Sequence, residues 1–127
     1  MASITALSQY GGIIYTGSKD MTVRLWKVNE TGVVPDSEKH ALFRHKGQIN
    51  CFQGSGKLML SGSSDKTIIV WEYNCFCSQK DFDSSVNIIT TCDYSNQLVV
   101  SEANGTISII CGTMLRKTKK IVVNRLV

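Results

Sequence analysis

The stretch TGSKDMTVRLW, Thr16 to Trp26, recurs 45 positions later as SGSSDKTIIVW, Ser61 to Trp71. Glycine, serine, aspartate, threonine and tryptophan stand at the same places in both copies. The register runs without a gap over residues 4–28 of the first copy. Self-similarity at a fixed spacing of this length indicates a protein built of structural repeats.

A third copy is weaker. At a spacing of 40, the apolar run 58–60 meets the run 98–100, and Ser61 meets Ser101. After the deletion of one residue, DKTIIVW meets NGTISII, which runs from Asn104 to Ile110. Three successive copies therefore cover nearly the whole chain of 127 residues.

Each copy has the pattern of three short strands joined by turns that are rich in glycine, serine or asparagine. In the third strand, apolar residues such as Val23 and Leu25 alternate with their neighbours, and this period of two is typical of β-strands. A fourth strand is expected after each copy, near residues 40–44, 79–83 and 121–125. No segment of ten residues carries the apolar stripe of a helix, so the sequence predicts an all-β protein.

A four-stranded unit of about 40 to 45 residues is typical of one blade of a β-propeller. On GSKDMTVRLW, GSSDKTIIVW and the decayed ANGTISII, the chain resembles the WD-repeat β-propeller family. The resemblance implies a single domain over residues 1–127 made of about three four-stranded antiparallel blades. Their expected bounds are residues 1–44, 45–84 and 85–127.

In WD-repeat blades, a histidine, a serine or threonine, an aspartate and a tryptophan form a hydrogen-bonded chain. The resemblance assigns these places in the second blade to His45, Ser61, Asp65 and Trp71. The indole N–H would find an acceptor there while its ring fills the space between blades. We expect this network to be structural, because a buried and fully satisfied network fixes one strand register.

The other two blades depart from this pattern. The first has Thr16, Asp20 and Trp26, but the place of its histidine falls just ahead of Met1. The third has Ser85, Ser101, Asn104 and Ile110 at the four places, so no network is expected in it.

A histidine beside an aspartate also suggests a catalytic pair, for which Ser61 would be the nucleophile. Nothing in the sequence supplies an oxyanion hole or a cleft for that chemistry. The sequence therefore predicts no catalytic residue and no enzyme.

Three blades are too few to close a ring, because propellers typically have about four to eight. An open array leaves an apolar face at each end, and such faces usually mark an interface. We expect the ring to be completed by a partner chain, by a second copy of this chain, or by residues of a longer protein. The missing histidine ahead of Met1 favours a propeller that is truncated or split.

Propellers act through loops held on a rigid disc, so the first function hypothesis is a non-enzymatic protein–protein interaction scaffold. The resemblance places partner contacts on the turns after the second strands and on the loops that enter the first strands. The candidate residues are Lys19, Met21, Arg44, Lys46, Gln48, Ser64 and Lys66. They are positive or neutral, which suits an acidic peptide, and solvated turns that bind nothing are the alternative.

The net charge of +4 is concentrated near the C-terminal end, because the residues after Glu102 include five bases and no acid. The second hypothesis is an RNA-associated role in a ribonucleoprotein assembly, with phosphate contacts from clustered bases. These bases are Arg116, Lys117, Lys119 and Lys120. No aromatic residue lies among them to stack on bases, so an exposed hairpin turn or a charged edge strand is the preferred interpretation.

Substrate recognition for a ubiquitin ligase is a third hypothesis, which the sequence disfavours. One adaptor motif of the family requires Trp-Asp-x-Arg. The two tryptophans are followed here by Lys27-Val28-Asn29 and by Glu72-Tyr73-Asn74, neither of which contains arginine.

Five cysteines without an export signal indicate reduced thiols. Cys75 and Cys77 would lie on one side of a strand, where burial as small hydrophobic residues is preferred over a metal or redox role. No apolar run is long enough for a membrane span. The sequence thus predicts an intracellular protein, cytoplasmic or nuclear, with protein partners and without a cofactor, metal or membrane contact.

Overall fold

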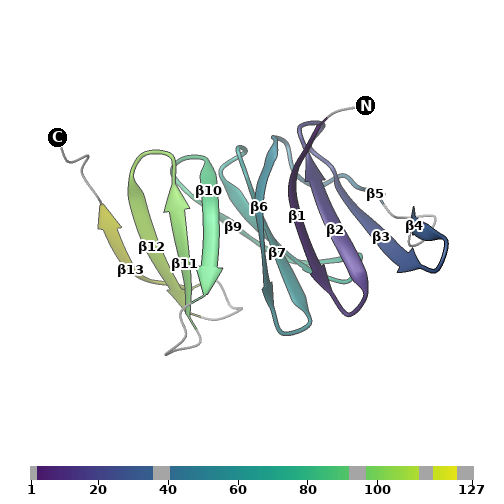
Figure 1. The fold of residues 1–127 in the computed structure, drawn as a ribbon. Coiled ribbons are helices and arrows are strands. Elements are labelled where there is room, and N and C mark those ends of the chain that lie inside the picture. The colour runs from purple at the N-terminus through teal and green to yellow at the C-terminus, as the bar shows by residue number, and fades with distance from the viewer. Residues whose placement is uncertain (1–2, 36–40, 92–96, 112–115, 123–127) are drawn as a thin grey trace.

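The computed structural model describes residues 3–35, 41–91, 97–111 and 116–122. These residues form three antiparallel sheets that stand side by side in chain order and do not close into a ring (Figure 1). The fold class is all-β, as predicted. Among the described residues, no helix is long and apolar enough to span a membrane.

The strands of each sheet are consecutive in the chain. The first sheet contains β1 (Ile4–Tyr10), β2 (Ile13–Ser18), β3 (Val23–Asn29), β4 (Gly32–Pro35) and β5 (Ala41–Leu42). The second contains β6 (Ile49–Ser55), β7 (Leu58–Ser63), β8 (Thr67–Glu72) and β9 (Cys75–Asp81). The third contains β10 (Val86–Thr91), β11 (Gln97–Glu102), β12 (Thr106–Cys111) and β13 (Arg116–Val122).

The outermost strands β4, β9 and β13 begin earlier than the sequence predicts, whereas β5 lies within the predicted range 40–44. β9 and β13 start at Cys75 and Arg116, and the outermost place of the first sheet is shared by β4 and β5, which both pair with β3. The chain reverses within two residues after β8, where Tyr73 adopts a positive φ of 56°. A turn this tight brings the next strand forward, so the predicted positions were too late.

Two apolar layers lie between the three sheets, because successive side chains on the middle strands point to opposite faces. In β7, Met59 packs toward the first sheet with Leu25 and Ile69. Its neighbour Leu60 packs toward the third sheet with Val100. All five of these side chains are at most 1% exposed, so the middle sheet is covered on both faces.

The glycine repeated in the opening motif is required by close approach of adjacent sheets. A Cβ atom at Gly17 would lie 2.3 Å from Cγ2 of Ile49 on the neighbouring sheet. A Cβ atom at Gly62 would lie 2.6 Å from Cγ1 of Val86. Both distances are far inside van der Waals contact, so each layer leaves no room for a side chain at this place.

The third sheet is set one residue away from the register that the sequence predicts. Ser61 pairs with Phe52 in the second sheet, and the same place in the third sheet is held by Val100, which pairs with Ile89. The match of Ser61 with Ser101 is therefore wrong. A shift of one residue moves a side chain to the opposite face of a strand, so Ser101 points away from the second sheet.

Candidate functional site

Ser61 lies at the centre of a polar network in the second sheet. Its Oγ accepts a hydrogen bond from Nε1 of Trp71 at 2.8 Å and lies 2.6 Å from Nε2 of His45. Nδ1 of His45 lies 3.0 Å from Oδ2 of Asp65. The structure thus links the four residues that the resemblance assigned, in one continuous chain.

The protons of this chain follow from the donors available. An ionised Asp65 can only accept from Nδ1, and Nε2 of a neutral imidazole then accepts the Ser61 hydroxyl proton across the 2.6 Å contact. Burial lowers the pKa of His45, although Asp65 acts in the opposite direction. Burial raises the pKa of Asp65, but hydrogen bonds from Thr67, the Lys46 backbone and His45 outweigh it and leave that pKa lowered. A neutral histidine therefore faces an ionised aspartate.

The serine, histidine and aspartate have the order of a hydrolytic triad, but no substrate can reach the serine. Ser61 is 0% exposed, because it lies beneath the neighbouring sheet. Its hydroxyl is already engaged by Trp71 and His45. The arrangement serves to hold β7, β8 and the segment around His45 in one register.

The first sheet has the same links without a histidine. Nε1 of Trp26 donates to Oγ1 of Thr16 at 2.8 Å. Oδ1 of Asp20 accepts from the backbone and the hydroxyl of Thr22, at 3.1 and 2.6 Å. Trp26 is only half-buried, because it lies on the face of the first sheet that points away from the second.

The third sheet replaces the histidine with an apolar side chain. The backbone bond from Ala103 to Ser85 corresponds to the bond from Ser64 to Gln48, so Ser85 occupies the place of Gln48. The prediction that Ser85 takes the place of histidine is therefore wrong by three residues. That place belongs to Phe82, which is buried in the core between the second and third sheets.

In the third sheet, where no network was expected, a buried carboxylate forms hydrogen bonds instead of the histidine and aspartate. Oε1 of Glu102 accepts hydrogen bonds from the backbone N–H groups of Asp83 and Ser84, both at 3.1 Å. Its Oε2 lies 3.5 Å from the hydroxyl of Ser108. Glu102 is 3% exposed and binds the loop ahead of β10 much as Asp65 binds the loop ahead of β6. The sequence comparison missed it because the one-residue shift placed it on the wrong face.

Most of the candidate partner-binding residues share one edge of the sheets, which we call the turn face. Lys19 and Met21 lie in the β2–β3 turn, Ser64 and Lys66 lie in the β7–β8 turn, and Lys46 and Gln48 precede β6. The backbone N–H of Ser64 donates to the Gln48 carbonyl at 2.9 Å, which joins turn and loop. Met21 and Lys66 both have positive φ, of 74° and 72°, and each directly follows the aspartate of its turn.

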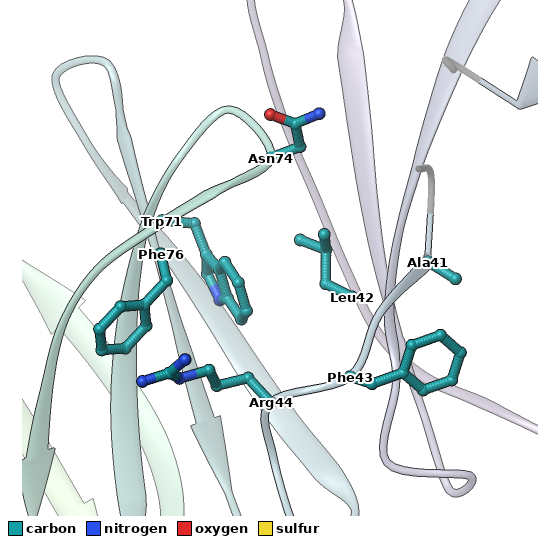
Figure 2. Close-up of a pocket in the computed structure, with 7 residues that line it drawn as sticks. All are labelled: Ala41, Leu42, Phe43, Arg44, Trp71, Asn74 and Phe76. Atoms are coloured by element: carbon teal, nitrogen blue, oxygen red, sulfur yellow. The ribbon is translucent and has the colours of Figure 1, made fainter. Parts of the chain in front are cut away.

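Arg44 is separate from these residues. Its Cζ atom lies 3.6 Å from the ring centroid of Phe76 on β9, so its guanidinium stacks on that ring. It lines a cavity of about 390 Å³ with Ala41, Leu42, Phe43, Trp71, Asn74 and Phe76 (Figure 2). An adjoining cavity of about 450 Å³ shares Phe43 and Arg44 and is lined further by Lys46, Asp65, Thr67 and Gln79. We call the two together the linker groove.

The basic segment forms a strand. Arg116, Lys117, Lys119 and Lys120 lie on β13, which pairs with β12 and is the last strand of the third sheet. The hairpin-turn interpretation is therefore wrong, and the segment is a charged edge strand.

The cysteine pair is placed on the surface. Cys75 and Cys77 lie on β9 and are both exposed, so the prediction that they are buried is wrong. β9 is the outermost strand of its sheet, and none of its described residues belongs to the two buried apolar clusters between the sheets. Cys51 is instead partly buried, and this burial raises the pKa of its thiol to about 11. Among the described residues, no group of three or more histidine, cysteine or acidic side chains is placed to hold a metal ion.

The outer faces of the two end sheets are apolar. Leu7, Val28 and Val33 are at least 57% exposed on the face of the first sheet that carries Trp26. Ile88 is 59% exposed on the outer face of the third sheet.

Comparison with known proteins agrees with this geometry. Residues 2–27 and 37–72 match the WD40 family, described as WD domain, G-beta repeat. The chain belongs to the WD40 repeat family. Its fold is similar to that of the WD40 domain of Toxoplasma gondii coronin, with a TM-score of 0.81 and 17% sequence identity. That match covers 96% of this chain and 34% of the coronin chain.

The chain is also similar, over part of its length, to curated proteins. A p21-activated protein kinase-interacting protein 1-like protein of Danio rerio is 40% identical over 72 residues, or 55% of this chain. Zinc finger CCCH domain-containing protein 59 of Arabidopsis thaliana is 29% identical over 75 residues, or 58% of this chain. The matches span 18% and 16% of the lengths of these two proteins. WD40 domains commonly serve as protein-interaction scaffolds and are typically not catalytic.

Proposed function

We propose that this chain is a non-enzymatic scaffold for protein–protein interaction in an intracellular assembly, and that further sheets complete its ring. The observation that carries the proposal is the pair of apolar outer faces. Equivalent faces inside the chain are buried against the next sheet, as at Leu25 and Ile69. Full burial of a side chain such as Leu7 or Val28 would contribute about 1.5–3 kcal/mol.

The additional sheets have three conceivable sources: a partner chain, a second copy of this chain, or residues of a longer protein. The third sheet argues against a second copy. Ser101 holds the place of Gly62, because it pairs with Ile88 as Gly62 pairs with Cys51. At Gly62 the neighbouring sheet leaves no room for a Cβ atom. A second copy that presented Ile4 there, as the second sheet presents Ile49 to the first, would meet the Ser101 side chain. We therefore favour sheets of different sequence.

The mass of the purified chain in solution, measured together with binding of the hydrophobic dye ANS, tests the open faces. We expect either a species heavier than 14.0 kDa or a monomer that binds ANS. Val28→Glu on the first sheet and Ile88→Glu on the third should reduce whichever signal is seen. A monomer that binds no dye would contradict the proposal.

We also propose that the turn face contacts an acidic partner. Lys19, Lys46 and Lys66 are exposed there, and their charge supports electrostatic attraction of such a segment. Charge reversal at Lys19 and Lys66 should slow the association of this chain with an acidic partner segment at low salt, without changing the free energy of unfolding. An association rate that stays the same would remove the turn face from consideration.

The position of the basic residues favours an RNA-associated role as a second candidate. β13 is an edge strand, so its backbone edge and its four clustered bases lie at the rim of the third sheet. A titration of RNA binding against salt tests this role, because phosphate contacts lose affinity steeply as salt rises. Absence of binding at low salt would eliminate it.

A further inference from the structure

The linker groove lies between the first and second sheets and shares Lys46 with the turn face. Arg44 forms a wall common to both of its cavities, because it lines each of them. In Figure 2, the Arg44 side chain runs toward Phe76, Leu42 points toward Trp71, and the Phe43 ring lies at the opposite side of the opening. The groove thus has an apolar floor and a cationic wall.

Its aromatic side chains are exposed to an unusual extent for large apolar residues. Phe43 is 78% exposed and Phe76 is 38% exposed, although Trp71 beside them is 2% exposed. Aromatic and arginine side chains are enriched among the residues that dominate binding energy in protein interfaces. The Phe76 ring also holds the Arg44 guanidinium in place, so less conformational entropy is lost when that group binds a carboxylate.

The charge of the groove favours an anionic occupant. Within the described part of the chain, no carboxylate forms an ion pair with Arg44 or Lys46. Asp65 is the one acid in the lining, and its oxygens already accept hydrogen bonds from His45, the Lys46 backbone and Thr67. Two cations and one internally bonded carboxylate leave the groove with a net charge of +1.

We propose that the linker groove binds an extended acidic segment of a partner protein. An aliphatic or aromatic side chain of the segment enters the cavity beside Trp71 and Leu42, and a neighbouring carboxylate pairs with Arg44. The proposal rests on the scaffold function and adds a second contact surface to it. A peptide fits better than RNA, because the guanidinium lies on the Phe76 ring and two cations cannot follow a run of phosphates.

Fluorescence anisotropy with a short labelled peptide that alternates glutamate with leucine tests the proposal at physiological salt. We expect saturable binding to the full chain. Replacing the glutamates by lysine or the leucines by serine should each weaken binding about tenfold or more. Absence of saturable binding, or tighter binding of labelled oligouridine than of the peptide, would overturn the proposal.

Matched variants assign the binding to the groove. Arg44→Gln and Phe43→Ser should each weaken the peptide about tenfold, and both residues are exposed, so the fold is retained. Lys57→Ala, at an exposed lysine of the β6–β7 turn outside all the proposed surfaces, is the control and should stay within about twofold. Lys66→Ala on the turn face and Val28→Glu on the outer face separate the groove from the two other proposed surfaces. Equal losses in Lys66→Ala would place the peptide on the turn face instead. Loss only in Val28→Glu would place it on the outer sheet, and either result refutes the groove without refuting a scaffold.

Discussion

Replacement of Ser61 by alanine is the sharpest test of the buried network. The substitution leaves the indole N–H of Trp71 without its acceptor and Nε2 of His45 without its donor. Each buried polar group that loses its partner costs about 1–3 kcal/mol. With partial relaxation of the site, we expect the free energy of unfolding to fall by about 3 kcal/mol.

Thr16→Val in the first sheet is the matched control. Thr16 accepts the same indole bond from Trp26, but no histidine joins it and the indole is half-buried on an outer face. Because water can reach the stranded N–H, this change should cost about 1 kcal/mol or less. Urea unfolding followed by circular dichroism measures both variants. A loss below about 1 kcal/mol for Ser61→Ala, or equal losses for the two, would refute the reasoning.

Three further outcomes follow from the same contacts. The pKa of His45 is lowered in the folded state, so the unfolded chain binds a proton at higher pH than the folded chain does. The free energy of unfolding should therefore fall as pH drops below about 6.5. In a pH series of urea unfolding, His45→Gln should remove this decrease. Gly62→Ala should cost about 1–3 kcal/mol through overpacking, whereas Gly54→Ala should be nearly neutral in the same assay, because the nearest atom to its new Cβ is 3.9 Å away. A thiol reagent should label exposed Cys75 in the native state and leave Cys51 unmodified, and peptide mapping that found Cys51 labelled equally fast would contradict its burial.

The first two sheets could be predicted well from the sequence, because their close packing and their hydrogen bonds each require particular residue types. Gly17 and Gly62 are required by close approach, and Asp65 and Trp71 have bonding partners that few other residues can replace. Because these constraints require particular residue types, the first two copies carry the same residues and can be aligned by eye. The alternation of apolar residues then fixed the strand type.

The third sheet was harder because it keeps the geometry with different chemistry. Phe82 fills the place of histidine, and Glu102 supplies the carboxylate from the strand rather than from the turn. Identity therefore aligned Ser101 with Ser61, whereas burial aligns Val100 there. The register of the third sheet is set by which side chains face the second sheet and not by residue identity. It therefore cannot be predicted until the position of the second sheet is known.

The linker groove had no signal of its own in the sequence. Arg44 and Phe76 are far apart along the chain and meet only because β9 returns beside the segment that joins β5 to β6. The one available hint was Phe43, a large apolar residue next to a charged one in a connecting segment. Single residues of this kind are common on protein surfaces, so the hint does not predict a site.

The two tryptophans donate the same hydrogen bond from different surroundings. Both indole nitrogens lie 2.8 Å from a hydroxyl oxygen, yet Trp71 is sealed between sheets and Trp26 is half-buried on an outer face. Indole emission moves to shorter wavelength when the ring leaves water. The chain therefore carries its own fluorescent reporter of docking. A blue shift from Trp26 records a sheet that covers the first sheet, whereas emission from Trp71 changes only when the adjoining groove is filled or the sheets separate.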